Sequence, residues 1–242
     1  MIALTSYLRE LKLDGVRSCL ENLISEGEAD LAVLRPVLQR LFEAEVEERK
    51  IAKANRLLKQ ARFRYEAGIA SLKVGASRNI SKEDVQRLAQ FRWVARGQNL
   101  LITGPTGAGK SYLASALGRQ SCQHGYKTLY FNSNKLWLSL IQAKKREKYS
   151  KELSKLSKVE LLILDDFGLT KLDSESRLFF FDILEERWGR ASTMVISQRP
   201  FASWHELLGE PTVADAICDR LFANSEKIEL KGESLRQMAD IS

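Results

Sequence analysis

The stretch that most constrains this chain of 242 residues is GPTGAGKS, at positions 104–111. It matches the phosphate-binding pattern G-x-x-x-x-G-K-[ST] in full, between an apolar run at 100–103 and a helix-like segment that begins at Tyr112. Glycines let backbone N–H groups close around phosphate oxygens, and the amino end of the following helix adds a positive dipole. A glycine-rich turn that matches by accident is the alternative, and the flanking pattern disfavours it. The contacts expected for a nucleoside triphosphate come from Gly104, Pro105, Thr106, Gly107, Ala108, Gly109, Lys110, Ser111 and Tyr112.

A magnesium site should accompany such a loop, and the sequence offers one. Lys110 is expected to contact the β and γ phosphates, and the hydroxyl of Ser111 to ligate Mg²⁺. An apolar run at 161–164 ends in Asp165 and Asp166, and adjacent carboxylates in that position require a cation or hydrogen-bond donors. We expect Asp165 to hold Mg²⁺ and Asp166 to activate the attacking water. A solvated turn or a helix cap is the alternative for this pair.

The spacing of apolar residues predicts the fold. Short apolar runs at 100–103, 128–131, 161–164, 194–197 and 227–230 alternate with longer helix-like stretches, which is typical of a parallel sheet covered on both faces. Before them, leucines and alanines recur at helical spacing and predict one long amphipathic helix that continues through basic residues to Tyr65. We therefore expect a helical domain over 1–75 and an α/β domain over 76–242. The second should begin with a helix capped by Ser81.

Two further positions are candidates for a hydrolytic site. In ATPases of this architecture, the strand between the phosphate-loop strand and the acidic strand carries a polar side chain near the γ phosphate. Ser197 or Gln198 would fill that place, although an ordinary exit from the strand is equally consistent. Arg220, in a helix-like segment that begins at Thr212, could enter a neighbouring subunit's site and stabilise transition-state charge. A surface salt bridge is the alternative for Arg220.

The charge balance indicates the class of partner. A formal net charge of +7 favours a polyanion, and nucleic acid is preferred to a membrane because no apolar run approaches the roughly 20 residues that span a bilayer. Three scattered cysteines suit free thiols and the cytoplasm. We expect two basic runs to contact DNA. The first is Arg49, Lys50, Lys53, Arg56, Lys59 and Arg62, and the second is Lys144, Lys145, Arg146 and Lys148. The alternative for each run is a helix face that is only exposed to solvent.

Together, GPTGAGKS, LLILDD, SQRP, DRLF and GESLR resemble the AAA+ ATPases of the IstB and DnaC type. The amino-terminal LRELKLDGV and RLFEAEVEERKIAKANRLLKQARF make IstB-type transposition helper proteins the nearest likeness. This resemblance implies an AAA+ P-loop core with a parallel five-stranded sheet after a small all-helical domain. It also implies ATP and Mg²⁺ as cofactors, and a homo-oligomer, ring or spiral, that assembles on double-stranded DNA and helps a cognate transposase to select and prepare its target. By the same resemblance Arg220 matches the arginine finger, and Arg236 is a weaker candidate for a second nucleotide sensor. Because only a short tail follows residue 230, we expect the ATPase domain to lack a full helical lid.

Three other functions are consistent with parts of this pattern. A loader of the replicative helicase would share the ATPase core but would need an amino-terminal surface for the helicase. A small-molecule phosphotransferase would act as a monomer without DNA, and the paired aspartates and basic helix disfavour it. A nucleotide-gated scaffold would bind ATP and hardly hydrolyse it. The preferred prediction is a DNA-stimulated ATPase that serves transposition.

Overall fold

The computed structural model describes residues 2–25 and 31–235. These residues belong to two compact units, Met1–Arg56 and Leu57–Ser242, and the boundary falls inside a helix. The functional division expected at residue 75 stays a prediction.

The first unit consists of helices and a short connection in its described part. It contains α1 (Ile2–Glu10), α2 (Asp14–Ser25) and the first part of α3 (Leu31–Ala61). Its small core is formed by Leu4, Leu8, Leu20, Leu13, Leu38 and Phe42. The hydroxyl of Tyr7 donates to Glu43 across 2.9 Å, which ties α1 to α3 within this unit.

The long amphipathic helix predicted from the leucine spacing is confirmed, but its end is not where we expected it. The helix α3 stops at Ala61, whereas the sequence pattern continued to Tyr65. Arg62 ends it because its backbone lies in the left-handed region, with φ at +58°. Arg62 and the residues after it therefore lie beyond the helix, and Phe63 packs against the core of the second unit.

The second unit is built around a parallel sheet. Five strands lie in the order β2-β3-β4-β1-β5, and every neighbouring pair is parallel. The strands are β1 (Asn99–Thr103), β2 (Thr128–Asn132), β3 (Leu161–Phe167), β4 (Ser192–Ser197) and β5 (Ser225–Glu229). The helices are α4 (Lys82–Leu88), α5 (Arg92–Ala95), α6 (Lys110–Gln123), α7 (Ser133–Lys145), α8 (Tyr149–Ser157), α9 (Ser174–Arg187), α10 (Trp204–Leu208) and α11 (Pro211–Phe222). Single 3₁₀ turns are η1 (Ile69–Ser71), η2 (Ala76–Arg78) and η3 (Phe201–Ser203).

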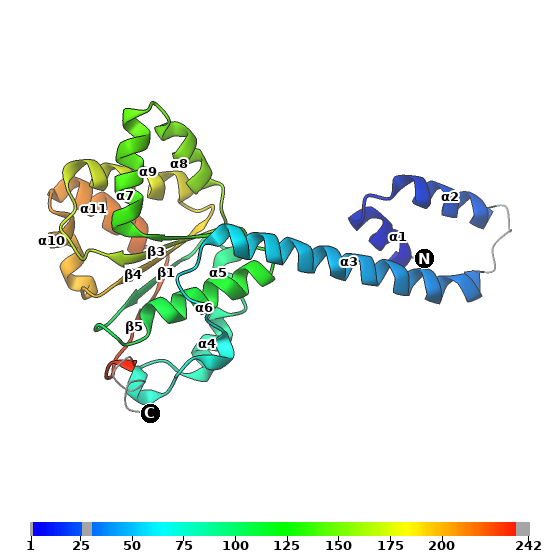
Figure 1. Cartoon of the computed structure of the whole chain (residues 1–242), viewed down its shortest axis with the longest axis horizontal. Helices are drawn as coiled ribbons and strands as arrows, with labels where there is room; N and C mark the ends of the chain where they lie inside the picture. Colours follow the sequence, from blue (N-terminus) through cyan, green and yellow to red (C-terminus); the bar gives the residue numbers. More distant parts are fainter. Residues whose placement is uncertain (1, 26–30, 236–242) are drawn as a thin grey trace. The chain divides into compact units, whose positions relative to one another are not determined.

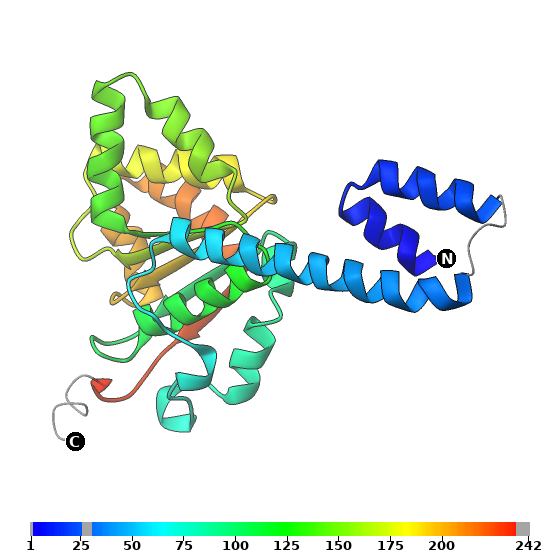
Figure 2. The same cartoon turned by 45° about the vertical axis from the view of Figure 1, so that its right-hand side comes forward.

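Helices cover both faces of this sheet, as the sequence predicted. Figure 1 shows α7, α8 and α9 on one side and α4 and α6 on the other, and the turned view in Figure 2 agrees. Successive strand residues point to opposite faces, so Leu101 joins the core beneath α7 and α9 while Leu100 and Ile102 join the core beneath α6. All three are fully buried, and burying such a side chain contributes about 1.5–3 kcal/mol.

The local sequence signals for the start of α4 are confirmed. Ser81 accepts a hydrogen bond from the backbone N–H of Asp84, and the Asp84 carboxylate accepts from the backbone N–H of Ser81. This capping box fixes the start of α4. Its hydrogen bonds, first among them the one from the Ser81 backbone, hold the pKa of Asp84 below its usual value. Across residues 2–25 and 31–235, no helix has the length and apolar character needed to cross a membrane.

Candidate functional site

The phosphate loop lies at the carboxyl end of the sheet, between β1 and α6. The strand β1 ends at Thr103 and α6 begins at Lys110, so the loop opens directly onto the amino end of a helix, as the sequence predicted. Gly104, Gly107 and Gly109 have φ values of +143°, +81° and +92°, which glycine adopts far more easily than other residues. The glycines of the pattern are therefore required by the backbone itself.

Gly104 gives the sharpest test of this requirement. A Cβ atom added there would lie 2.3 Å from the backbone oxygen of Leu230, which cannot move freely because Leu230 N–H bonds Thr103 O. We expect Gly104→Ala to lower the free energy of unfolding by about 1–3 kcal/mol through strain and this clash. Urea unfolding followed by circular dichroism measures the change. Gly68→Ala is the matched control, because its nearest neighbour would be 3.9 Å away, and equal losses for both variants would contradict the argument.

Lys110 points into the loop that precedes it. Its Nζ donates to the backbone oxygens of Gly104 and Pro105 at 2.7 and 2.8 Å, and the residue is buried. The loop thus places a buried ammonium group beside the amino end of α6, and helices present backbone N–H donors at that end. This donor set suits the oxygens of a polyphosphate.

Ser111 and Asp165 come together across the base of α6. The Ser111 hydroxyl donates to Asp165 Oδ1 over 3.1 Å, and the same oxygen accepts from the backbone N–H of Asp166 at 2.9 Å. The second oxygen of Asp165 accepts from the hydroxyl of Tyr130 in a short hydrogen bond. Burial, and then the neighbouring Asp165 charge, raise the pKa of Tyr130, so its hydroxyl remains a donor. A hydroxyl and a buried carboxylate are ligands that Mg²⁺ accepts alongside phosphate oxygens, so these residues fit the metal.

Asp166 lies next to this pair but in a different environment. Although β3 continues to Phe167, the Asp166 backbone has φ at +57° and the ladder with β4 is irregular there. This turn directs the Asp166 side chain into the cavity at the phosphate loop. Its Oδ2 accepts from Arg64 Nη1 at 3.1 Å and from Asn132 Nδ2 at 2.9 Å.

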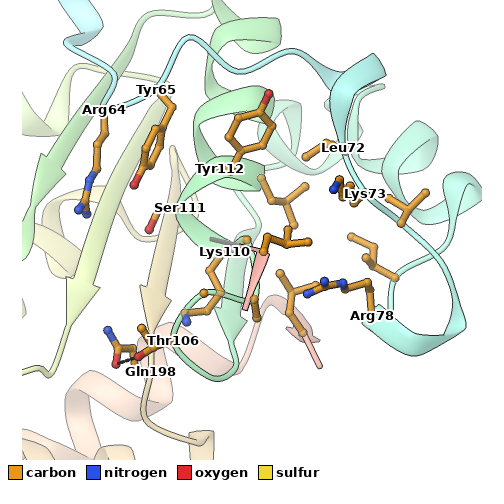
Figure 3. A pocket seen from close by; sticks show the side chains of 18 of the residues that line it. Arg64, Tyr65, Leu72, Lys73, Arg78, Thr106, Lys110, Ser111, Tyr112 and Gln198 are labelled. Carbon is orange, nitrogen blue, oxygen red and sulfur yellow. Dashed lines mark hydrogen bonds between the residues drawn. The ribbon is translucent and has the colours of Figure 1, made fainter. Parts of the chain in front are cut away.

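The strand β4 lies between β1 and β3, as the sequence interpretation required. Gln198 reaches the phosphate loop, where its Oε1 accepts from the Thr106 hydroxyl at 2.7 Å (Figure 3). Ser197 is fully buried, and its hydroxyl donates to the backbone oxygen of Phe167 while accepting from Arg199 N–H. The geometry therefore favours Gln198 over Ser197 as the polar group near a γ phosphate.

A cavity of about 640 Å³ extends from the phosphate loop. Figure 3 shows Arg64 and Tyr65 on one side of the loop and Leu72, Lys73 and Arg78 on the other. The lining also includes the apolar residues Val74, Ile80 and Leu230. A cavity that combines phosphate donors with apolar surface has the size and chemistry of a nucleotide site.

The segment after β5 also approaches the loop. Leu235 N–H donates to Gly107 O at 3.0 Å, and its side chain lines the cavity. Arg78 holds this segment from the other side, since its Nη1 donates to Glu233 O at 2.7 Å. Arg236, the candidate second sensor, lies outside the described residues.

Arg220 is not part of this cavity. It lies near the end of α11, and its backbone oxygen accepts from Asn99, the first residue of β1, whereas the phosphate loop follows the last residue of β1. In this chain its guanidinium donates to Glu185 and packs over the ring of Phe181 at 4.8 Å. The salt bridge considered from the sequence is thus present, and a strand of this length separates Arg220 from the loop by roughly 13 Å or more.

The two basic runs have different surroundings. On α3, Lys50, Lys53, Arg56 and Lys59 are exposed, as is Arg62 just beyond the helix, whereas Arg49 is tied to Glu45 at 2.7 Å and to Leu11 O. In the second run, Lys144 pairs with Glu175 at 2.9 Å. Lys145, Arg146 and Lys148 are exposed where α7 gives way to α8. Contact with DNA stays a prediction for both runs.

Sequence reasoning missed three contributors to the site. Asn132 ends β2, and the carboxyl ends of parallel strands meet at one edge, so its position carried a usable signal. Tyr130 lies inside the same strand, and its position in the sequence gave no signal of a functional role. Arg64 is separated from Asp166 by 102 positions, and only the fold brings them together.

Known proteins resemble the whole chain. The family described as IstB-like ATP binding protein matches residues 6–241. A Sinorhizobium fredii protein named as an insertion sequence ATP-binding protein is 37% identical over 230 residues, which cover 95% of this chain and 94% of the relative. The ATP-binding protein named for insertion sequence IS21 in Pseudomonas aeruginosa is 30% identical, over 98% of this chain and 89% of its own length.

Solved structures resemble the fold. The DnaC helicase loader superposes with a TM-score of 0.61 at 19% identity, covering 69% of this chain and 98% of that one. DnaI gives a TM-score of 0.60 at 21% identity, over 73% and 94% of the two chains. These likenesses support the expected AAA+ core, which the sheet order and the family match confirm. The chain belongs to the family of IstB-like ATP binding proteins.

Proposed function

We propose that this protein is an ATP-dependent assembly factor that oligomerises on double-stranded DNA and assists a transposase in target selection and insertion. ATP would be held at the interface between subunits, and its hydrolysis would loosen the assembly. The names of the relatives place them in insertion sequences, which supports transposition. The likeness to a helicase loader is one of fold alone, so the helicase-loading alternative has less support.

The residues at the cavity can each perform one part of ATP hydrolysis. Lys110 and the loop amides would bind the β and γ phosphates, and Ser111 with Asp165 would hold Mg²⁺. Mg²⁺, when bound, neutralises charge on the phosphate oxygens. Asp166 would accept a proton from the attacking water, and Gln198 would contact the γ phosphate or that water.

One observation carries the proposal of assembly: the chain holds its phosphate loop and Arg220 at opposite ends of β1. A single chain therefore cannot bring Arg220 to its own phosphates without unfolding the sheet. A second chain, docked head to tail, could present Arg220 from the other side. An arginine supplied in this way stabilises transition-state charge and makes hydrolysis depend on assembly.

The exposed cations support DNA as the polymer on which subunits gather. Contacts from lysines and arginines to phosphates bind DNA without reading its sequence, and they weaken steeply as salt is raised. The residues in question are Lys50, Lys53, Arg56, Lys59, Arg62, Lys145, Arg146 and Lys148.

The proposal is tested by ATP hydrolysis and by assembly on duplex DNA. We expect duplex DNA to raise kcat, and the stimulation to fall between 50 and 200 mM salt. With a non-hydrolysable ATP analogue and DNA, electron microscopy should show ordered multisubunit particles. Lys53→Glu together with Arg56→Glu should weaken DNA binding while leaving hydrolysis without DNA unchanged.

Two results would contradict the proposal. Dispersed single chains under saturating nucleotide and DNA would exclude assembly. Lys110→Ala is the control for nucleotide dependence, since it removes the buried ammonium group of the loop. If this variant self-associates and binds duplex DNA as the wild type does, ATP does not control the affinity of the protein for DNA.

A further inference from the structure

The segment Phe63–Tyr65 connects the end of α3 with both aspartates of the site. Phe63 meets the ring of Tyr130 edge-on at 6.1 Å, and Tyr130 in turn donates to Asp165. Phe63 also lies against α6 where Gly118 leaves space, because a Cβ at Gly118 would be 2.4 Å from its ring. The aromatic ring of Phe63 thus packs this segment against β2 and α6.

The next two residues extend the connection. Tyr65 packs its ring 6.1 Å from that of Tyr112 on α6. In the sequence Arg64 lies between Phe63 and Tyr65. Its guanidinium is 5.4 Å from the Tyr65 ring, and its Nη1 is 3.1 Å from Asp166 Oδ2. Figure 3 shows Arg64 and Tyr65 side by side at the edge of the cavity. A single residue, Arg62, separates this segment from α3.

The contact between Arg64 and Asp166 opposes the role proposed for Asp166. The Oδ2 atom of Asp166 accepts from two donors, Arg64 and Asn132. Both lone pairs of this oxygen are then occupied, so it cannot also accept a hydrogen bond from a water molecule. Proton transfer requires the base within hydrogen-bond reach of the water. One of the two donors must therefore leave before Oδ2 can serve as the proton acceptor, and Arg64, whose side chain is 44% exposed, is the donor that the segment after α3 carries.

The contact is also weak enough to be broken by a modest movement. The Arg64 side chain is 44% exposed and that of Asp166 is 19% exposed, and ion pairs accessible to solvent contribute little to stability. The restraint is thus of the size that binding of a partner can overcome. Because only Arg62 intervenes, a shift of the end of α3 would be passed directly to Phe63–Tyr65.

We propose that Arg64 is a positioning residue that restrains Asp166 until α3 engages DNA. This inference rests on the proposed function and adds its regulation: DNA bound along α3 draws Arg64 away from Asp166 and frees the carboxylate for hydrolysis. The same segment also contacts Asp165, directly through Arg64 Nη1 at 3.7 Å from Asp165 Oδ2 and indirectly through Phe63 and Tyr130, so both carboxylates respond to one element.

The test replaces Arg64 with methionine, which has a similar length and no donor. For the full chain we expect Arg64→Met to raise kcat in the absence of DNA about two- to fivefold, because an exposed ion pair contributes a free energy of that size. The KM for ATP should change little. Stimulation by DNA should fall in the same proportion. Arg64→Lys retains the charge without the planar fork and should restore part of the restraint. Arg96→Met, which removes an exposed arginine remote from the site, should change neither rate.

A merely structural role for Arg64 is separated by a second background. Arg64 acts through the Asp166 carboxylate, so Arg64→Met should give no gain when it is added to Asp166→Asn. A lower or unchanged kcat without DNA, or the same gain in both backgrounds, would overturn the proposal. Thermal unfolding of each variant checks that the fold is retained. The wild type's own response to DNA tests the proposed function separately, because the rate without DNA reports the restraint whether or not DNA stimulates.

Discussion

A mixture of Lys110→Ala and Arg220→Ala chains is expected to hydrolyse ATP, although each variant alone is nearly inactive. Lys110→Ala removes the phosphate ligand of a subunit's own site, and Arg220→Ala removes the group offered to its neighbour. Loss of an arginine finger lowers kcat on the order of 10³-fold or more. In an equal mixture about a quarter of head-to-tail interfaces pair an intact loop with an intact arginine, so activity should return to that extent.

Controls for this experiment come from the partner of Arg220 in the isolated chain. Glu185→Gln removes the carboxylate that Arg220 contacts but leaves the arginine in place. If Arg220 only forms a surface salt bridge, Arg220→Ala and Glu185→Gln should change kcat to the same extent. A large loss for Arg220→Ala and a small change for Glu185→Gln identify the arginine itself as the active group. A mixture that stays inactive would show that Arg220 does not complete a neighbouring site.

Asp166→Asn is expected to trap the ATP-bound assembly on DNA. Asparagine has nearly the same shape and its oxygen can still accept from Arg64 and Asn132, but it lacks the basicity to take a proton from water. We expect kcat to fall about 10²- to 10⁴-fold while ATP still binds. Under these conditions the complex with duplex DNA should persist in ATP, whereas the wild type releases DNA as ATP is consumed. Dissociation of DNA, followed by fluorescence anisotropy, measures the difference.

The neighbouring carboxylate provides the contrast. Asp165 is buried and contacts Ser111 and Tyr130. Asp165→Asn should weaken magnesium-dependent ATP binding and therefore prevent assembly, the opposite of a trap. Equal effects of the two substitutions would mean that the division of labour proposed for the pair is wrong.

The parts of the site that could be predicted share one property: their signal is local. The phosphate loop is a run of adjacent residues, and Asp165 and Asp166 directly follow an apolar run. The position of β4 between β1 and β3 followed from the architecture and is confirmed. The five predicted strands are also confirmed, with ends that differ by a few residues; most begin earlier or end later than the apolar runs, whereas β5 ends one residue before its predicted end.

The parts that could not be predicted depend on backbone turns and on distant contacts. A left-handed residue at Arg62 ended α3 early, although arginine at this position carries no turn signal. That turn is what places Arg64 at Asp166. The choice between Ser197 and Gln198 likewise required coordinates, because the hydroxyl of Ser197, the last residue of β4, bonds backbone groups, whereas Gln198 lies beyond the strand and reaches Thr106.

The placement of Arg220 and the phosphate loop at opposite ends of β1 implies that the two ends of the proposed assembly would differ. A head-to-tail contact that does not close into a ring leaves two unlike termini. One terminal subunit would carry a loaded nucleotide that lacks its arginine, and the other would carry an arginine with no nucleotide to meet. Such a filament has a direction along the DNA, and a second protein could recognise one terminus without binding the other.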